Sequence, residues 1–182
     1  MLKIHKLVYA AVFVAAGALL PQLFHVLGGP QAGMIFLPMH IPVFICGMFL
    51  GSLYGSAAGL LIPLLSFLIT GGTMPPAERL PFFIIELVLY GIASGFFASI
   101  IKSTYLTLIS SMIVGRLVYA GLLCIAFYAF GMKSAAPIAV WSSLIKGIFG
   151  VIIQLAVIPP VVYALRRYSN DREHNSKSNS NA

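Results

Sequence analysis

Residues 81–101 read PFFIIELVLYGIASGFFASII, an apolar run interrupted by one charged side chain, Glu86. About 20 consecutive apolar residues are enough to cross the hydrocarbon core of a bilayer as a helix. The rest of the chain has the same character, because 60% of its 182 residues are hydrophobic and 8% are charged, whereas about 25% are charged in soluble proteins. The composition therefore predicts an integral membrane protein with almost no soluble mass.

Six apolar segments of this kind follow one another along the chain. Residues 1–24 also resemble a signal peptide, but the apolar run is long and no clear small-residue cleavage pattern follows it, which favours a retained helix. We expect an all-α fold of six transmembrane helices in one compact bundle spanning residues 1–168, followed by a disordered polar tail at 169–182. Turn-forming and charged residues divide the apolar segments at approximately 4–24, 34–51, 53–71, 81–101, 105–130 and 137–165.

Positive charges are unevenly divided between the two sides of such a bundle. With six spans both termini lie on one side, and the other side would hold only Arg79 and Lys133 of the flanking cations. Because Lys and Arg are enriched on the cytoplasmic side, we predict that both termini are cytoplasmic. This placement follows membrane topology, so the net charge of +7 does not indicate a nucleic-acid partner. The cations on the predicted cytoplasmic side are Lys3, Lys6, Lys102, Arg166, Arg167, Arg172 and Lys177.

The second and third segments contain residues that interrupt or tighten helices. Pro38, Pro42 and Pro63 predict kinks or breaks, because proline removes a backbone donor and clashes with the preceding turn. Glycines recur at every fourth position across the turn between the two segments, which predicts a tight hairpin and close helix approach. These glycines are Gly47, Gly51, Gly55 and Gly59.

Ionisable residues inside the spans gather in one half of the membrane. Glu86, Arg116 and Lys146 lie within apolar segments. At about 1.5 Å per helical residue, they and His40 fall in the outer half of the bundle or near its middle. Charge inside a bilayer is costly and is usually kept for a substrate or ion pathway. We therefore predict an outward-facing polar cavity.

Neighbours at helical spacing extend this candidate site. Tyr90 follows Glu86 by one turn, and Tyr119 lies three residues after Arg116. The last segment carries Trp141 near its outer end, and then a small and polar stripe made of Ser143, Lys146, Gly147, Gly150 and Gln154. The predicted binding residues are His40, Glu86, Tyr90, Arg116, Tyr119, Trp141, Ser143 and Lys146.

The charge count indicates what the cavity would bind. Glu86 can pair with either Arg116 or Lys146, so the other cation is available to an anionic group of a ligand. The alternative is that these charges only hold the bundle together. His40 has no second His or Cys at ligand spacing, so neither a metal nor another cofactor is expected. Cys46 and Cys124 lie in separate apolar runs, which does not favour a disulfide.

The sequence motifs do not indicate an enzyme. The chain contains no HExxH, no GxSxG, no P-loop and no dinucleotide-binding glycine motif. Transport by this chain would therefore need an ion gradient or a partner that supplies energy.

Several blocks of the sequence resemble the substrate-binding S-component of an energy-coupling factor (ECF) transporter. The likeness covers about residues 5–165. It is carried by FLPMHIPV at 36–43, GSLYG at 51–55, PLLS at 63–66, TGGTMPP at 70–76, ELVLYG at 86–91 and GRLVY at 115–119.

The resemblance implies a multi-pass protein of the bacterial plasma membrane that captures a water-soluble vitamin and is not an enzyme. It implies association with a transmembrane coupling subunit and two ATPases. A helix-one AxxxA motif contacts the coupling subunit in this family, and Ala11 and Ala15 match it. The block at 39–42 looks most like the pantothenate subgroup, while pyridoxine-type vitamins, nicotinate, folate and cobalamin are alternatives. Outside the family, the alternatives are an ion-coupled secondary transporter that uses Glu86 and a membrane scaffold.

Overall fold

The computed structural model describes residues 3–36, 38–73, 75–77, 79–130 and 148–180, and within these ranges the chain forms helices and turns with no strand. Five of the described helices are long and apolar enough to cross a membrane, and the sixth, α2, has 11 residues. The expected all-helical membrane bundle is confirmed. The helices are α1 (Lys3–Phe36), α2 (His40–Leu50), α3 (Ser52–Ile69), α4 (Leu80–Ile100), α5 (Thr104–Phe130) and α7 (Ile148–Ser180).

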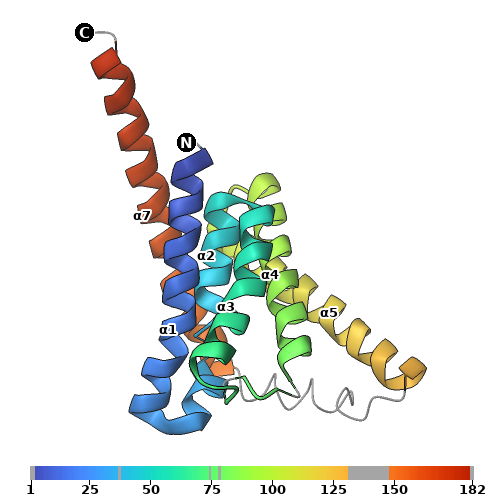
Figure 1. Cartoon of the computed structure of the whole chain (residues 1–182). Helices are drawn as coiled ribbons and strands as arrows, with labels where there is room; N and C mark the ends of the chain where they lie inside the picture. Colours follow the sequence, from blue (N-terminus) through green and yellow to red (C-terminus); the bar gives the residue numbers. More distant parts are fainter. Residues whose placement is uncertain (1–2, 37, 74, 78, 131–147, 181–182) are drawn as a thin grey trace.

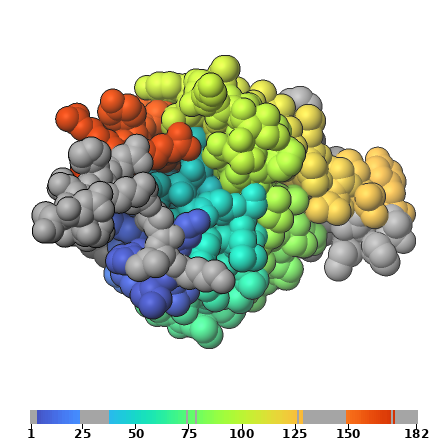
Figure 2. All heavy atoms as spheres, turned by 90° about the horizontal axis from the view of Figure 1, so that it is seen from above, coloured from blue at the N-terminus to red at the C-terminus, as the bar shows by residue number. Residues whose placement is uncertain are grey.

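The short helix α2 forms the centre of the bundle. It packs against α1, α3, α4 and α7, and all but two of its residues are buried. Viewed from the end at which α1 begins, the teal residues around the α2–α3 turn lie in the middle, with α1, α7 and α4 around them (Figure 2). At about 1.5 Å per residue α2 covers roughly half of a bilayer core. A helix that is apolar on every face is stable only inside other protein or lipid.

Helix α2 is shorter than the second span predicted at 34–51, because the residues directly before His40 are not helical. Residues 38 and 39 lie in a turn, and α2 begins at His40. Proline disfavours helix in the residue before it and cannot donate within a helix interior, so Pro38 marks the break. Pro42 lies in the first turn of α2, where the missing N–H has no partner to lose.

The first helix is longer than predicted. The sequence predicts a first span that ends near residue 24, but α1 continues as helix to Phe36. Its lower end bends and runs beneath the bundle (Figure 1). Glycine and proline are the usual sites of such bends, because they weaken or remove the hydrogen bonds that keep a helix straight.

The helices alternate in direction, so α1 begins and α7 ends at the same end of the bundle (Figure 1). The α2–α3 and α4–α5 connections lie at this end too, and Lys102 belongs to the second of them. At the same end, Nη2 of Arg166 on α7 donates to the carbonyl oxygen of Met48 at 3.1 Å. This carbonyl belongs to the last turn of α2, where carbonyl oxygens have no N–H donor within the helix to pair with. That this end faces the cytoplasm stays a prediction.

The last helix continues into the polar segment 169–182. Its backbone is helical to Ser180, and the disordered tail expected at 169–182 stays a prediction. Extending an existing helix costs far less than nucleating one, which accounts for a helical backbone in a segment with little apolar surface.

Glycines bring α3 and α4 into backbone contact. A Cβ on Gly55 would lie 2.5 Å from the carbonyl oxygen of Gly91, and one on Gly59 would lie 2.5 Å from the carbonyl oxygen of Leu87. A Cβ on Gly95 would collide with the backbone of Ser52, whose hydroxyl donates to the Ile92 carbonyl at 3.1 Å. The glycine repeat therefore forms a close helix interface, as the sequence predicted.

We expect Gly91→Ala to destabilise the protein, because the added methyl would meet the backbone of Gly55 rather than a movable side chain. Overpacking of this kind costs about 1–3 kcal/mol. Gly121→Ala on α5 is the matched control, since an added Cβ there meets nothing within 4 Å and alanine favours helix. Thermal unfolding in detergent should give a lower midpoint for the first variant only, and equal midpoints would contradict the packing assigned to Gly91.

Candidate functional site

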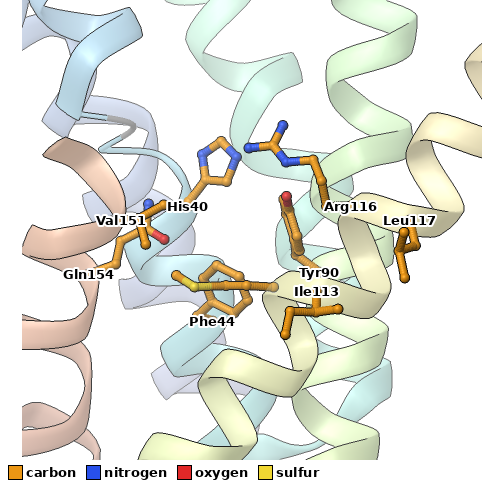
Figure 3. A pocket seen from close by; sticks show the side chains of 9 residues that line it. His40, Phe44, Tyr90, Ile113, Arg116, Leu117, Val151 and Gln154 are labelled. Carbon is orange, nitrogen blue, oxygen red and sulfur yellow. The ribbon is translucent and has the colours of Figure 1, made fainter. Parts of the chain in front are cut away.

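A cavity of about 320 Å³ lies between α2, α4, α5 and α7. Its volume is within the range of about 300–1,000 Å³ that is typical of small-ligand sites. Apolar side chains form most of its lining, and a few polar groups from different helices converge on it (Figure 3). The lining residues are His40, Phe44, Tyr90, Met112, Ile113, Arg116, Leu117, Val151 and Gln154.

Three rings form the α2–α4 wall of this cavity. His40 is the first residue of α2 and is 2% exposed. Its ring centroid lies 5.4 Å from that of Tyr90, and the centroid of Phe44, one turn further along α2, lies 5.1 Å from the same ring. Aromatic pairs at such separations stabilise each other beyond the area that they bury. The three rings therefore pack into an aromatic wall that does not need a ligand in order to form.

An ion pair joins α4 to α5 beside the aromatic wall. Nη1 of Arg116 donates to Oε1 of Glu86 at 2.7 Å. The Tyr90 hydroxyl donates to the same oxygen at 3.4 Å, and the Arg116 Cζ lies 6.0 Å from the centre of the Tyr90 ring. The structure therefore pairs Glu86 with Arg116, and Lys146, the other cation that the sequence offered, lies outside the described residues.

A glycine makes this pairing possible. Gly115 precedes Arg116 on α5, and a Cβ at that position would lie 2.5 Å from Cδ1 of Tyr90. Without a side chain there, the α5 backbone rests directly on the Tyr90 ring. The guanidinium of the next residue then reaches Glu86.

The predicted site residues do not all meet at the cavity. His40, Tyr90 and Arg116 line the cavity, and Glu86 is hydrogen-bonded to the lining residue Arg116. Tyr119 packs beside Leu123 with neighbouring apolar residues and is not among the lining residues. Trp141, Ser143 and Lys146 lie outside the described residues.

Ala11 and Ala15, the predicted partner-contact residues, are exposed on α1. Large apolar side chains on the same helix are exposed as well, among them Val8, Val12 and Leu19. This part of α1 therefore presents small and large apolar side chains to its surroundings.

Sequence reasoning missed several lining residues. Phe44, Met112 and Val151 have no pattern that separates them from core residues. Gln154 gave a signal, because it is an amide within the apolar run GVIIQLAVI at 150–158 and belongs to the polar stripe. Among the described residues, no group of three His, Cys, Asp or Glu side chains is placed to hold a metal ion.

The ion pair should behave as one unit in stability measurements. Arg116→Met leaves Glu86 without its cation at a site where it is 6% exposed, and breaking a buried pair costs about 3–5 kcal/mol. The double variant Glu86→Leu/Arg116→Met removes both charges and should recover most of that loss. Thermal unfolding in detergent of both variants measures this. If the double variant were as unstable as the single variant, the two charges would not act as a pair in stabilising the protein.

The family model described as ECF transporter, substrate-specific component, matches residues 5–162. No curated protein and no solved structure matches the chain. The family match covers most of the 182 residues and includes every helix that lines the cavity, α7 in part. The chain therefore belongs to the family of substrate-specific components of ECF transporters.

Proposed function

We propose that this protein captures a water-soluble vitamin with a carboxylate group, with pantothenate as the first candidate, in the cavity between α2, α4, α5 and α7. The observation that carries the proposal is the position of the Glu86–Arg116 ion pair, with the Tyr90 hydroxyl hydrogen-bonded to it, at the edge of a cavity of small-ligand size. Charged groups inside a membrane protein are rarely kept without a function in binding or transport. The vitamin-binding roles of the residues named in the sequence analysis belong to the same proposal.

Family membership defines the general role. ECF substrate-specific components are transport subunits that bind a small molecule, and ATP hydrolysis takes place in partner subunits. The chain is accordingly a multi-pass membrane protein that works with a coupling subunit and ATPases. We place it in the bacterial plasma membrane.

The ion pair changes which cation is expected to meet the carboxylate. Glu86 compensates the charge of Arg116, so the excess positive charge counted in the sequence belongs to Lys146. Arg116 lines the cavity and can add hydrogen bonds, because a guanidinium has five N–H donors. We therefore assign charge recognition to Lys146 and orientation of the ligand to Arg116.

A second function, ion-coupled transport by the isolated chain, would use Glu86 as a proton carrier. The contact of Glu86 with both Arg116 and Tyr90 favours a fixed structural charge instead. The family match also supports energy supply by ATPases.

Lys146→Met should weaken pantothenate binding at least tenfold, because charged hydrogen bonds contribute about 1.5–3 kcal/mol each and 1.4 kcal/mol is one decade. Pantothenyl alcohol lacks the carboxylate, so it should bind the native protein poorly and lose little affinity in the variant. Calorimetry on purified protein measures both. Equal affinity of the native protein for acid and alcohol would exclude carboxylate recognition, and absence of any heat with pantothenate would exclude this vitamin.

We also expect the coupling subunit to dock on the exposed α1 face that carries Ala11 and Ala15, because small residues permit close helix approach. The double variant Ala11→Leu/Ala15→Leu should abolish uptake in cells and leave ligand binding in detergent nearly unchanged. Ala57→Leu, at an exposed position on α3, is the control and should transport normally. Loss of binding in the folded double variant would place these alanines at the ligand site instead.

A further inference from the structure

Gln154 on α7 carries a buried amide nitrogen that has no hydrogen-bond partner among the described residues. The residue is 2% exposed. It lines the cavity, and its amide end points inward from α7 on the side of His40 (Figure 3). A polar group in this state is unusual, because buried polar groups in native proteins are nearly always hydrogen-bonded.

Several other polar side chains in the bundle donate to carbonyl oxygens of their own helix. The Ser94 hydroxyl donates to the Gly91 carbonyl at 3.1 Å, and the Ser111 hydroxyl donates to the Thr107 carbonyl at 2.6 Å. The half-buried Gln22 on α1 donates through Nε2 to the Ala18 carbonyl at 3.3 Å. Gln154 has the same chemistry as Gln22, but it directs its amide into the cavity.

The position of Gln154 indicates the kind of group that it would meet. The charged pair of the site joins α4 and α5, whereas Gln154 lies on α7 next to the apolar Val151. A neutral amide cannot compensate a buried charge, so a ligand carboxylate would lie toward the charged residues and leave a neutral acceptor for Gln154. An amide carbonyl or a hydroxyl oxygen of the ligand fits this description.

We propose that Gln154 is a specificity-determining residue that donates a hydrogen bond to a neutral amide or hydroxyl oxygen of the bound ligand. The proposal rests on the proposed function, because it takes the cavity as the ligand site. Ligands would then be recognised at two separate points, with charge at one end and a neutral acceptor against α7. A ligand that lacks the neutral acceptor would leave the amide buried and unpaired, which discriminates strongly between otherwise similar molecules.

The test replaces Gln154 by Met, which has a similar length and no donor, with Gln22→Met as the matched control. Pantothenate and pantothenyl alcohol both carry an amide carbonyl and hydroxyls. Gln154→Met should therefore weaken the binding of both probes by a similar factor of about ten. Lys146→Met should weaken the acid selectively. Calorimetry compares the three variants with the native protein.

The ligand-free protein supplies a readout that does not depend on the probe. Removing an unpaired buried amide should raise the unfolding midpoint of ligand-free Gln154→Met by about 2–4 °C. A structural role for Gln154 predicts the opposite, because a lost internal hydrogen bond lowers the midpoint. Gln22→Met should lower it slightly.

A lower midpoint for Gln154→Met, or unchanged affinity for both probes, would overturn the proposal. If neither probe binds the native protein, pantothenate is the wrong ligand and the role of Gln154 is decided by two other measurements. These are the ligand-free midpoint and the occupancy of any co-purified small molecule in native mass spectra. Equal occupancy in native protein and Gln154→Met would overturn the proposal as well.

Discussion

The backbone contact between α3 and α4 is the constraint on which the rest of the bundle depends. Gly55 and Gly91 leave no room for a side chain on either helix, so the two axes can approach only where both residues are glycine. Close contact of this kind gains dispersion energy and is a main source of helix association in membranes, where lipid and protein interiors are equally apolar. Because α2 lies against both of these helices, the same contact also determines where the central helix sits.

This packing positions the cavity-lining Tyr90 and its hydrogen-bond partner Glu86 on α4. Tyr90 precedes Gly91 directly, and Glu86 lies one turn before it, so the depth of both is determined by the glycine contact. Tyr90 then meets His40 and Phe44 on α2, and Glu86 pairs with Arg116 on α5. A shift of α4 by one residue would move Tyr90 out of register with the rings of His40 and Phe44 on α2. The glycine contact between α3 and α4 therefore also positions the residues that are proposed to recognise a ligand.

The fifth helix depends on fewer contacts and completes the site from the other side. It leaves the bundle toward its C-terminal end (Figures 1 and 2), and near its middle Gly115 and Arg116 hold it against α4 through Tyr90 and Glu86. The cavity lies between this helix and α7. A hydrogen bond and an ion pair in a low-dielectric region are strong but local. They therefore hold α5 against α4 near Arg116, while the C-terminal end of α5 diverges from the bundle.

The sequence alone determined the class of fold, because about 20 apolar residues in succession have one stable arrangement in lipid, the helix. It also predicted the close glycine interface and the gathering of His40, Tyr90 and Arg116, since these follow from helical period and depth. The tertiary structure decided what depends on the relative rotation of helices. It paired Arg116 with Glu86, left Tyr119 outside the cavity lining and added Phe44, Met112 and Val151 to that lining. Periodicity describes one helix at a time, whereas the face that a helix turns toward its neighbours is set by packing contacts between segments far apart in the chain.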